Sequence, residues 1–442
     1  MTKHIHVVGL DDFNGDKLQR IDLPEGLQVH ALMAYDEVKG QSTIDFDDLL
    51  EAGRRRLRGS NVPVDGVIGW WDFPTTSLVP ALCRDAGLPG PSLESVLKCE
   101  HKYWSRLVQR EAVPDYIPRF CAVDPFVDDP LAGIDIPYPF WIKPVKGFAS
   151  QLGFRIGSDA DFAHAIETIR QEIGRLGDPF DALLRRVELP EEVRRVGGHF
   201  CIAEEIIGGR QCTLEGYVQA GACEIYGVVD SIRLPNRTSF QRYQYPSRLP
   251  KRVQRWMVAV AKRIMGHIGY DNATFNMEFF WDPQRKKLWL LEINPRLSQS
   301  HADLFEKVHG VPHFQIMADL ALGRAPHWQG RIGAANCAAK FFIRRFKDAR
   351  VTAVPDADTI RAIEADHPGT EIDVRVKPGT VLSDLKDQDS YSFELADVFI
   401  GAANQRALLR SFADVRKRLT FRFAKPTSKR RLPDAEEAGS PA

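Results

Sequence analysis

Three oxygen-bearing side chains on one stretch of the chain have the types and spacing to bind a divalent cation. Residues 272–294 alternate between polar and apolar side chains around a polar, proline-containing segment at 282–287, which predicts two strands joined by a turn. Folding this hairpin about its turn places Glu278 opposite Glu292, with Asn294 two residues further along the same face. Two carboxylates and an amide carbonyl form a hard, oxygen-only ligand set, which suits Mg²⁺.

The same alternation predicts which side chains of the hairpin face the core. The expected apolar face consists of Phe275, Met277, Phe279, Trp281, Trp289, Leu291 and Ile293. Leu288 and Leu290 are expected on the opposite face, together with the two glutamates. Like charges opposite each other destabilise a strand pair, and a cation between them would remove that repulsion. On spacing alone, a solvated polar face with two unrelated glutamates explains the pattern equally well.

The residues that follow favour the cation site. The segment 292–296, EINPR, resembles the E-x-N-P-R signature of the ATP-grasp superfamily. The chain looks most similar to the carboxylate–amine ligases of that superfamily, whose fold is like that of biotin carboxylase and D-Ala–D-Ala ligase. The resemblance implies that Glu278, Glu292 and Asn294 bind the Mg²⁺ (or Mn²⁺) of bound ATP. It also implies that Arg296 is catalytic and stabilises a phosphorylated intermediate.

A helix predicted over residues 92–111 carries a lysine that the resemblance places near the nucleotide. Ser92 is a suitable N-cap for this helix. The linker helix of the superfamily carries a lysine that reaches the nucleotide phosphates, and Lys102 matches it. His101 stands where the family commonly has Asp. Without the family context, an isolated helical lysine is normally a solvated surface residue.

A second lysine and a loop of small residues also resemble phosphate-binding elements. Lys143 ends a predicted strand and is followed by Gly147 and Ser150, in a segment that resembles the family's K-P-x-x-G-x-x-S loop. Backbone N–H groups of small residues can approach phosphate oxygens closely. The resemblance implies that Lys143 is catalytic and contacts the α-phosphate, and that the loop is a lid over the other phosphates. Gly153 comes one residue later than the family pattern has it.

A strand–turn–strand segment is similar to the hinge that binds adenine in the superfamily. The strand over residues 199–207 ends in two glutamates, and two glycines then turn the chain into the next strand. The resemblance places Glu204, Glu205 and Ile207 at the adenine contacts and Glu215 on the next strand, facing the site. A strand–turn–strand with exposed glutamates is common, so the segment does not identify adenine binding by itself.

Acceptor selectivity is expected in segments that carry no readable code. Ser298, Ser300 and His301 follow the signature and are expected to shape a substrate site with Arg296. Residues 230–248 are expected to form a polar, aromatic, substrate-facing loop. The basic residues of this loop are Arg233, Arg237 and Arg242. They either hold a substrate carboxylate or are solvated. The segment 70–73 ends a predicted strand, where it either lines a cleft or is simply packed.

Composition narrows the class of protein. The chain has 442 residues, 44% of them hydrophobic and 27% charged, and a formal net charge of zero. Such a balance is typical of globular proteins and gives no sign of a nucleic-acid or anionic-membrane partner. No apolar run is long enough for a membrane helix. The seven cysteines lack C-x-x-C spacing, which favours reduced thiols in the cytoplasm.

The expected fold class is α/β (α+β), with the ATP-grasp arrangement that the resemblance implies. Residues 1–95 should form a Rossmann-like pre-ATP-grasp domain, and residues 96–330 the ATP-grasp domain, with a lid subdomain at about 117–207. Residues 331–423 read as a small C-terminal α/β domain. Residues 424–442 are polar and proline-rich and are expected to be disordered.

The resemblance implies an ATP-dependent ligase that joins a small-molecule carboxylate to an amine through an acyl phosphate, releasing ADP and phosphate. A biotin-carboxylase-like enzyme is the alternative within the fold, because the same signature serves both. A non-catalytic ATP-binding regulatory module is the alternative from another class, although the metal residues and Arg296 are all present. Homodimers are frequent in the superfamily, so a homodimer is a further expectation.

Overall fold

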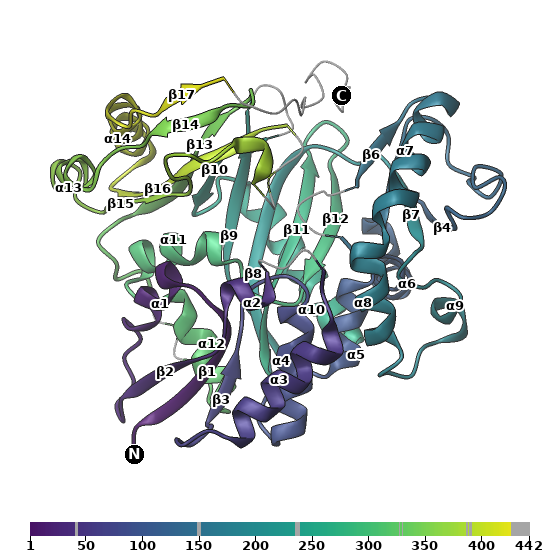
Figure 1. Ribbon diagram of the computed structural model, residues 1–442, viewed down its shortest axis with the longest axis horizontal. Helices are drawn as coiled ribbons and strands as arrows, with labels where there is room; N and C mark the ends of the chain where they lie inside the picture. Colours follow the sequence, from purple (N-terminus) through teal and green to yellow (C-terminus); the bar gives the residue numbers. More distant parts are fainter. Residues whose placement is uncertain are drawn as a thin grey trace.

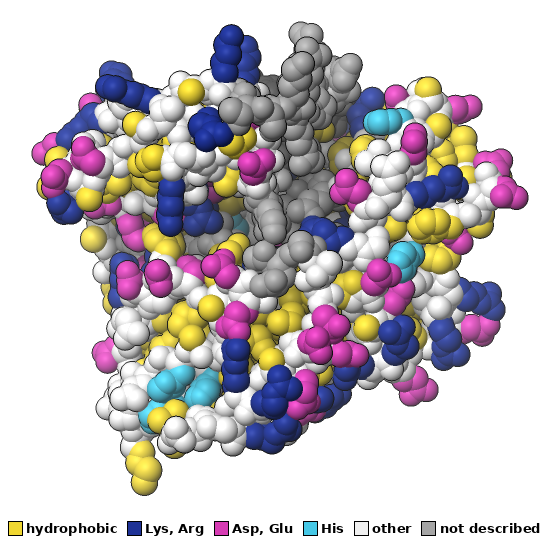
Figure 2. Space-filling view, viewed as in Figure 1, with side chains coloured by type: hydrophobic (Ala, Val, Ile, Leu, Met, Phe, Trp, Pro, Cys, Tyr) yellow, Lys and Arg dark blue, Asp and Glu magenta, His cyan; other side chains and the backbone are white. Residues whose placement is uncertain are grey.

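The computed structural model describes residues 1–39, 43–147, 152–234, 239–326, 328, 330–385, 388 and 391–425. Ser150 of the predicted lid loop, Arg237 and nearly all of the predicted tail lie outside these residues. No helix in the described ranges is long and apolar enough to cross a membrane. On the face shown in Figure 2, acidic and basic side chains are interspersed over the surface.

The N-terminal unit is built on a small parallel sheet (Figure 1). Its elements are β1 (Lys3–Leu10), α1 (Asp12–Leu18), β2 (Leu27–Ala34), α2 (Tyr35–Val38), α3 (Phe46–Arg58), β3 (Gly66–Ile68) and α4 (Thr75–Ala86). The strand order is β2-β1-β3, so β1 lies in the centre, where Ile5, Val7 and Val8 are fully buried. β3 is short, and its residues 66–68 pair with β1. α4 ends at Gly87, whose φ of +66° suits a C-cap glycine.

The predicted helix over residues 92–111 is wrong in one respect, because it breaks at His101. It consists of α5 (Leu93–Glu100) and α6 (Lys102–Ala112). His101 has an extended backbone, and its Nδ1 accepts a hydrogen bond from the Trp104 N–H at 3.2 Å, which caps α6. Its Nε2–H donates to the Val196 carbonyl at 2.8 Å. Burial lowers the pKa of His101 to about 4, so the imidazole stays neutral in both contacts.

The next segment forms a separate antiparallel sheet with helices packed on it. Its strands are β4 (Phe120–Val123), β5 (Phe140–Pro144), β6 (Phe154–Ile156) and β7 (Cys201–Glu205), in the order β4-β7-β5-β6. Its helices are α7 (Asp159–Glu172), α8 (Gly174–Leu184) and α9 (Glu191–Arg194), preceded by a 3₁₀ turn at Pro114–Tyr116. The apolar residues of β5, β7 and α7 share one buried core. This sheet stands at the right of Figure 1, beside the larger sheet.

An eight-stranded antiparallel sheet forms the centre of the described chain. Its first part contains β8 (Arg210–Gln219), β9 (Ala222–Arg233), β10 (Phe240–Tyr245), α10 (Lys251–Ile268), β11 (Ala273–Asp282), β12 (Lys287–Asn294), α11 (Gln299–His309) and α12 (His313–Ala321). Its second part contains β13 (Cys337–Arg345), β15 (Thr370–Val374) and β16 (Phe393–Ala402), with α13 (Ala357–Asp366), α14 (Gln405–Arg418) and a 3₁₀ turn at Leu382–Asp384. β14 (Arg350–Ala353) and β17 (Arg422–Ala424) pair with each other in a separate two-stranded sheet. The sheet order is β12-β11-β8-β9-β10-β13-β16-β15. The sheet is therefore continuous across the predicted boundary at residue 331.

Helices cover both faces of the large sheet. α10 packs on the face that carries Leu214 and Phe275, and α14 packs on the same face further along, beside Phe341. α11 packs on the opposite face, against Val229 and Tyr245. This second face also carries the side chains of Glu278 and of the residues paired with it across the sheet.

The prediction of a loop over residues 230–248 is wrong for most of its length. Its start belongs to β9, and residues 240–245 form β10, which joins the first and second parts of the sheet. Tyr243 and Tyr245 face α11, where aromatic side chains pack well on a pleated surface. The polar residues Gln241, Arg242 and Gln244 of this strand led to the prediction of a loop.

Candidate active site

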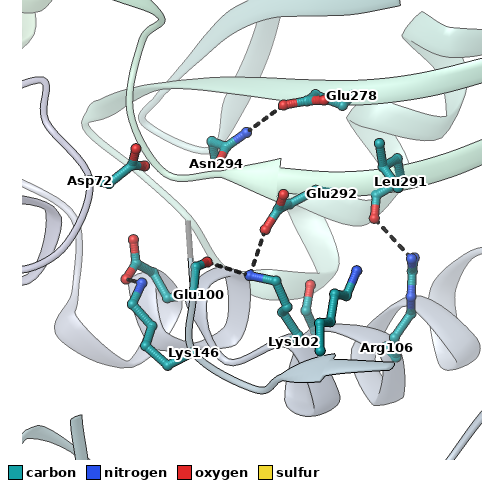
Figure 3. Close-up of polar contacts among 12 residues, drawn as sticks. Asp72, Glu100, Lys102, Arg106, Lys146, Glu278, Leu291, Glu292 and Asn294 are labelled. Atoms are coloured by element: carbon teal, nitrogen blue, oxygen red, sulfur yellow. Dashed lines mark hydrogen bonds and ion pairs between the residues drawn. The ribbon is translucent and has the colours of Figure 1, made fainter. Parts of the chain in front are cut away.

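The hairpin of β11 and β12 brings the predicted metal residues together. Glu278 pairs directly with Glu292, and Asn276 pairs with Asn294, which confirms the expected pairing of the two glutamates. Asn294 Nδ2 donates to Asn276 Oδ1 at 2.9 Å and lies 3.4 Å from Glu278 Oε1. Figure 3 shows Glu278, Glu292 and Asn294 around one space. Asn276, which pairs with Asn294, adds a further polar side chain to this face.

A β-bulge in β12 produces this arrangement and overturns part of the predicted alternation. The pairing steps from Glu278–Glu292 to Phe279–Leu290, so Leu291 is the extra residue. Leu290 is fully buried in the core, whereas Leu291 is partly exposed on the other side. The expected faces of residues 288–291 are therefore reversed. A strand without the bulge would set Glu292 opposite Met277 and point it into the core.

The two glutamates of the hairpin differ in their surroundings. Burial, and then the charge of Glu292, raise the pKa of Glu278. Burial alone would also raise the pKa of Glu292, but the ammonium groups of Lys102 and Lys143 outweigh it and lower that pKa. Gln211 Nε2 donates to Glu278 Oε2 at 2.8 Å and orients the carboxylate. The Glu292 carboxylate is thus paired with the Lys102 ammonium, and the Glu278 carboxylate is held by a side-chain amide.

Replacing Glu278 by Gln should stabilise the metal-free protein near neutral pH, by on the order of 1 kcal/mol in the free energy of unfolding. The raised pKa means that ionising Glu278 costs stability as the pH rises through its folded value, and Gln removes this cost. Below the ordinary pKa of 4.5 the carboxyl is neutral in both states, so the gain should disappear. Urea unfolding across this pH range measures it. A Gln variant less stable than the wild type at neutral pH would contradict the repulsion.

Lys102 links the hairpin to the start of the predicted lid loop. Its Nζ lies 2.9 Å from Glu292 Oε1 and donates to the Gly147 carbonyl at 2.8 Å. Its backbone N–H donates to the Val145 carbonyl at 2.9 Å. Burial would lower the pKa of Lys102, but Glu292 outweighs it and the pKa is raised, so the ammonium is charged. Lys102 therefore places a cation beside Glu292, and its predicted contact with the nucleotide phosphates stays a prediction.

Lys143 lies at the same end of the site, held by a buried carboxylate. Its Nζ is 2.6 Å from Glu204 Oε2, and Arg106 Nε is 2.5 Å from Glu204 Oε1. Burial would raise the pKa of Glu204, but Arg106 and Lys143 hold it at about 2. The Glu204 side chain is thus a counterion of Lys143. Its predicted adenine contact would have to use the backbone.

Arg296 reaches from the hairpin to the N-terminal unit. Its Nε donates to Asp72 Oδ1 at 2.7 Å, and its Nη1 donates to the Leu297 carbonyl at 3.2 Å. Burial would raise the pKa of Asp72, but Arg296 holds it at about 2. Within the segment 70–73, Trp70 is packed in the core and Asp72 lines the cleft, so both alternatives for that segment apply.

A single polar cavity connects these groups. It is lined by Asp72, Cys99, Glu100, Lys102, Lys146, Gly147, Glu278, Glu292, Ile293, Asn294, Pro295 and Arg296. Sequence reasoning missed Asp72 as a cleft carboxylate, and it missed the buried ion pair of Lys146 Nζ with Glu100 Oε2 (Figure 3). Thr76 Oγ1 donates to the other Glu100 oxygen at 2.7 Å. The position of Lys146 within the K-P-x-K-G segment was the one available signal.

Comparison with known proteins identifies the domain that carries this cavity. Residues 136–302 match the family model of the ATP-grasp domain. The chain contains an ATP-grasp domain. The resemblance predicted from the hairpin signature is therefore confirmed, and the cavity lies between that domain and the N-terminal unit.

Solved structures extend the likeness over the whole ATP-grasp fold. An L-amino acid ligase from Bacillus licheniformis has a TM-score of 0.71 and 12% identity, with 96% of this chain and 99% of that chain covered. A biotin carboxylase from Campylobacter jejuni has a TM-score of 0.61 and 14% identity, with 96% and 92% covered. The predicted α/β class and ATP-grasp fold are therefore confirmed.

One curated relative matches the sequence over part of its length. The urea amidolyase of Saccharomyces cerevisiae is 22% identical over 292 residues, which are 65% of this chain but 14% of that protein. The chain thus aligns with only a small part of this relative.

Some predicted residues of the ATP-grasp domain lie away from the cavity. Glu215 is fully buried, and its side chain contacts histidines. Its Oε1 lies 2.7 Å from Nδ1 of His301, and the Ser298 N–H donates to its other oxygen at 3.4 Å. Burial raises the pKa of Glu215 and lowers that of His301, so it disfavours the charged form of each. Ser300 Oγ accepts from Lys340 Nζ at 3.3 Å. The predicted nucleotide and substrate roles of these residues stay predictions.

The hinge residues beyond Glu204 are less enclosed. Glu205 ends β7, and its Oε2 is 3.8 Å from Arg119 Nε. Ile207 follows the strand and is half-buried. Neither lines the polar cavity, so their predicted adenine contacts also stay predictions.

The donor set fits a hard cation. In the described part of the chain, no group of three or more His, Cys, Asp or Glu side chains is placed to hold a metal. The candidate set is instead Glu278, Glu292 and the Asn294 carbonyl oxygen. Mg²⁺ usually binds through one or two carboxylates and keeps positions for water and substrate phosphates, so this set is sufficient.

Proposed function

We propose that the chain is an ADP-forming ligase that uses MgATP to join a carboxylate to an amine through an acyl phosphate. The observation that carries the proposal is the meeting of Glu278, Glu292, Lys102 and Arg296 in one polar cavity. A cavity with paired carboxylates beside several cations suits a polyphosphate and its metal ion.

Each cation at the site already has a carboxylate partner that sets its position. Glu292 holds Lys102, Glu204 holds Lys143, and Asp72 holds Arg296. Such pairs keep the ammonium and guanidinium groups in place before a substrate enters, so less conformational entropy is lost on binding. Phosphate oxygens would then add to, or take over, these contacts at Lys102 and Lys143.

Glu278, Glu292 and Asn294 would hold the Mg²⁺ (or Mn²⁺) ions. A bound ion would neutralise the β- and γ-phosphates and relieve the repulsion between the two glutamates. Arg296, fixed through its Nε, keeps further N–H donors of its planar fork for the transferring phosphoryl group.

The proposed reaction has two steps. A carboxylate oxygen attacks the γ-phosphorus, the bond to the bridging oxygen breaks, and ADP leaves. The amine nitrogen then attacks the acyl carbon, the C–O bond breaks, and phosphate leaves with the former carboxylate oxygen. The protein would position the reactants and stabilise charge. The predicted lid loop, whose residues 148–151 lie outside the described ranges, would exclude water. All seven cysteines are free, which suits a cytoplasmic location.

The test is the release of ADP and phosphate from MgATP with pools of amino acids and small carboxylic acids, singly and in pairs. The Glu292→Gln variant gives the background. Turnover that needs both an acid and an amine supports the ligase. Turnover that depends on bicarbonate and biotin would instead establish a biotin-carboxylase-like enzyme. Tight ATP binding without turnover in any pool would establish a regulatory module.

A further inference from the structure

The bulge that turns Glu292 towards Glu278 lies on a strand with one free edge. β12 is the outermost strand of the large sheet, so its outward carbonyls have no neighbouring strand to accept from. At the bulge, the carbonyls of Leu290 and Leu291 both turn to the same outward side. Buried carbonyls without donors cost stability, so this bulge needs a partner that contacts two adjacent oxygens.

Arg106 of α6 is that partner. Its Nη1 donates to the Leu290 carbonyl at 2.9 Å and its Nη2 donates to the Leu291 carbonyl at 2.8 Å. Figure 3 shows the guanidinium below Leu291, on the side of the strand away from Glu278. Only 3% of the Arg106 side chain is exposed, so water does not compete for these bonds. The planar guanidinium has five N–H donors, whereas a lysine ammonium has only three.

The same guanidinium also reaches the lysine side of the site. Its Nε donates to Glu204, which in turn holds Lys143. Gln109 Oε1, on the same helix, accepts a hydrogen bond from Nη1 at 2.6 Å and helps to hold the guanidinium in place. One buried side chain therefore touches the hinge strand β7 and the bulge that precedes Glu292.

We propose that Arg106 is a positioning residue that sets the metal-binding register of the hairpin. It stabilises the bulge, and the bulge decides whether Glu292 faces Glu278 or the core. Through Glu204 it also fixes Lys143 relative to the same carboxylates. Arg106 does not line the polar cavity, and it acts through the backbone of β12 and through Glu204. The inference rests on the proposed metal and nucleotide site.

The test compares metal affinity in the full-length wild type, Arg106→Lys and Arg110→Lys. Arg110 lies one turn further along α6 and is half-exposed, so it is a matched control. Mn²⁺ binding is followed by electron paramagnetic resonance in the presence of a non-hydrolysable ATP analogue, and analogue binding without metal is measured separately. Lys keeps the charge near Glu204 but has three N–H donors, too few for the contacts of Arg106 with Glu204, Gln109 and both carbonyls.

Arg106→Lys should weaken Mn²⁺ binding about 10- to 100-fold, the usual effect of losing a group that orients a metal ligand. Metal-free analogue binding should change much less, and Arg110→Lys should match the wild type. Gln109→Met is a milder variant in case Arg106→Lys fails to fold, and it should weaken Mn²⁺ binding about two- to tenfold.

Three results would overturn the inference in different ways. If the wild type binds Mn²⁺ with the analogue and both variants bind it equally well, Arg106 only stabilises the fold. If Arg106→Lys weakens Mn²⁺ binding and metal-free analogue binding to the same extent, the effect is not specific to the hairpin register. If the wild type binds no Mn²⁺ with the analogue, the proposed metal site fails and the inference fails with it.

Discussion

Replacing Glu292 by Gln should lower kcat about 100- to 1,000-fold, the range seen when one preorganised electrostatic group is lost from an active site. The substitution keeps the shape of the side chain but removes the charge from the pair with Glu278. It also removes the carboxylate partner of Lys102, whose Nζ lies 2.9 Å away. The loss of negative charge should weaken Mg²⁺ binding, so raising the Mg²⁺ concentration should restore part of the activity.

The matched control is Glu224→Gln, because Glu224 lies on β9 and 57% of its side chain is exposed. Its kcat should equal that of the wild type. Steady-state ADP release at several Mg²⁺ concentrations, together with thermal unfolding of both variants, separates lost chemistry from lost folding. If the Glu292→Gln variant has the kcat and the Mg²⁺ dependence of the wild type, Glu292 does not bind the metal.

Replacing Arg296 by Lys should also lower kcat about 100-fold or more, with little change in ATP affinity. Lysine keeps a cation beside Asp72, so that carboxylate retains a partner and the fold should persist. It lacks the planar fork that can contact Asp72 and a transferring phosphoryl group together. An interaction used mainly in the transition state appears in kcat rather than in substrate binding.

Arg285→Lys is the control for Arg296, because Arg285 lies at the turn of the same hairpin with 77% of its side chain exposed. ATP affinity is measured by calorimetry and kcat by ADP release. Equal losses in ATP affinity and kcat would place Arg296 in nucleotide binding instead of phosphoryl transfer. If ATP affinity and kcat are both unchanged in Arg296→Lys, Arg296 is not part of the active site.

The sequence allowed the hairpin and its carboxylate pair to be predicted because their signals are local. Alternation, a proline-containing turn and the EINPR segment lie within a short stretch and depend on no distant residue. The faces of residues 288–291 were predicted wrongly, because a bulge adds one residue without changing the pattern of residue types.

Other parts of the site depend on tertiary contacts that have no local signal. Asp72 and Arg296 are 224 residues apart. Glu100, at the end of α5, forms an ion pair with Lys146, which follows β5. Single charged residues at such separations show no periodicity and no characteristic spacing. Arg106 is similar, since a basic residue on an amphipathic helix is usually exposed, yet this one is buried against a strand edge.

The strand β10 was missed for a related reason. Its six residues mix aromatic side chains with the long polar side chains of Gln241, Arg242 and Gln244. Sequence patterns of turns and of polar strands overlap when both carry Arg, Gln and Tyr. The continuity of the sheet across β10 and β13 follows from pairing, which sequence alone does not give.

The most direct test of the proposed chemistry is the fate of the carboxylate oxygen. Once the screen has identified a substrate pair, the carboxylate is labelled with ¹⁸O and the released phosphate is analysed by mass spectrometry. An acyl phosphate requires one labelled oxygen to leave with each phosphate, because the amine breaks the C–O bond on the carbon side. Unlabelled phosphate, formed at the same rate as the amide product, would contradict the acyl-phosphate route.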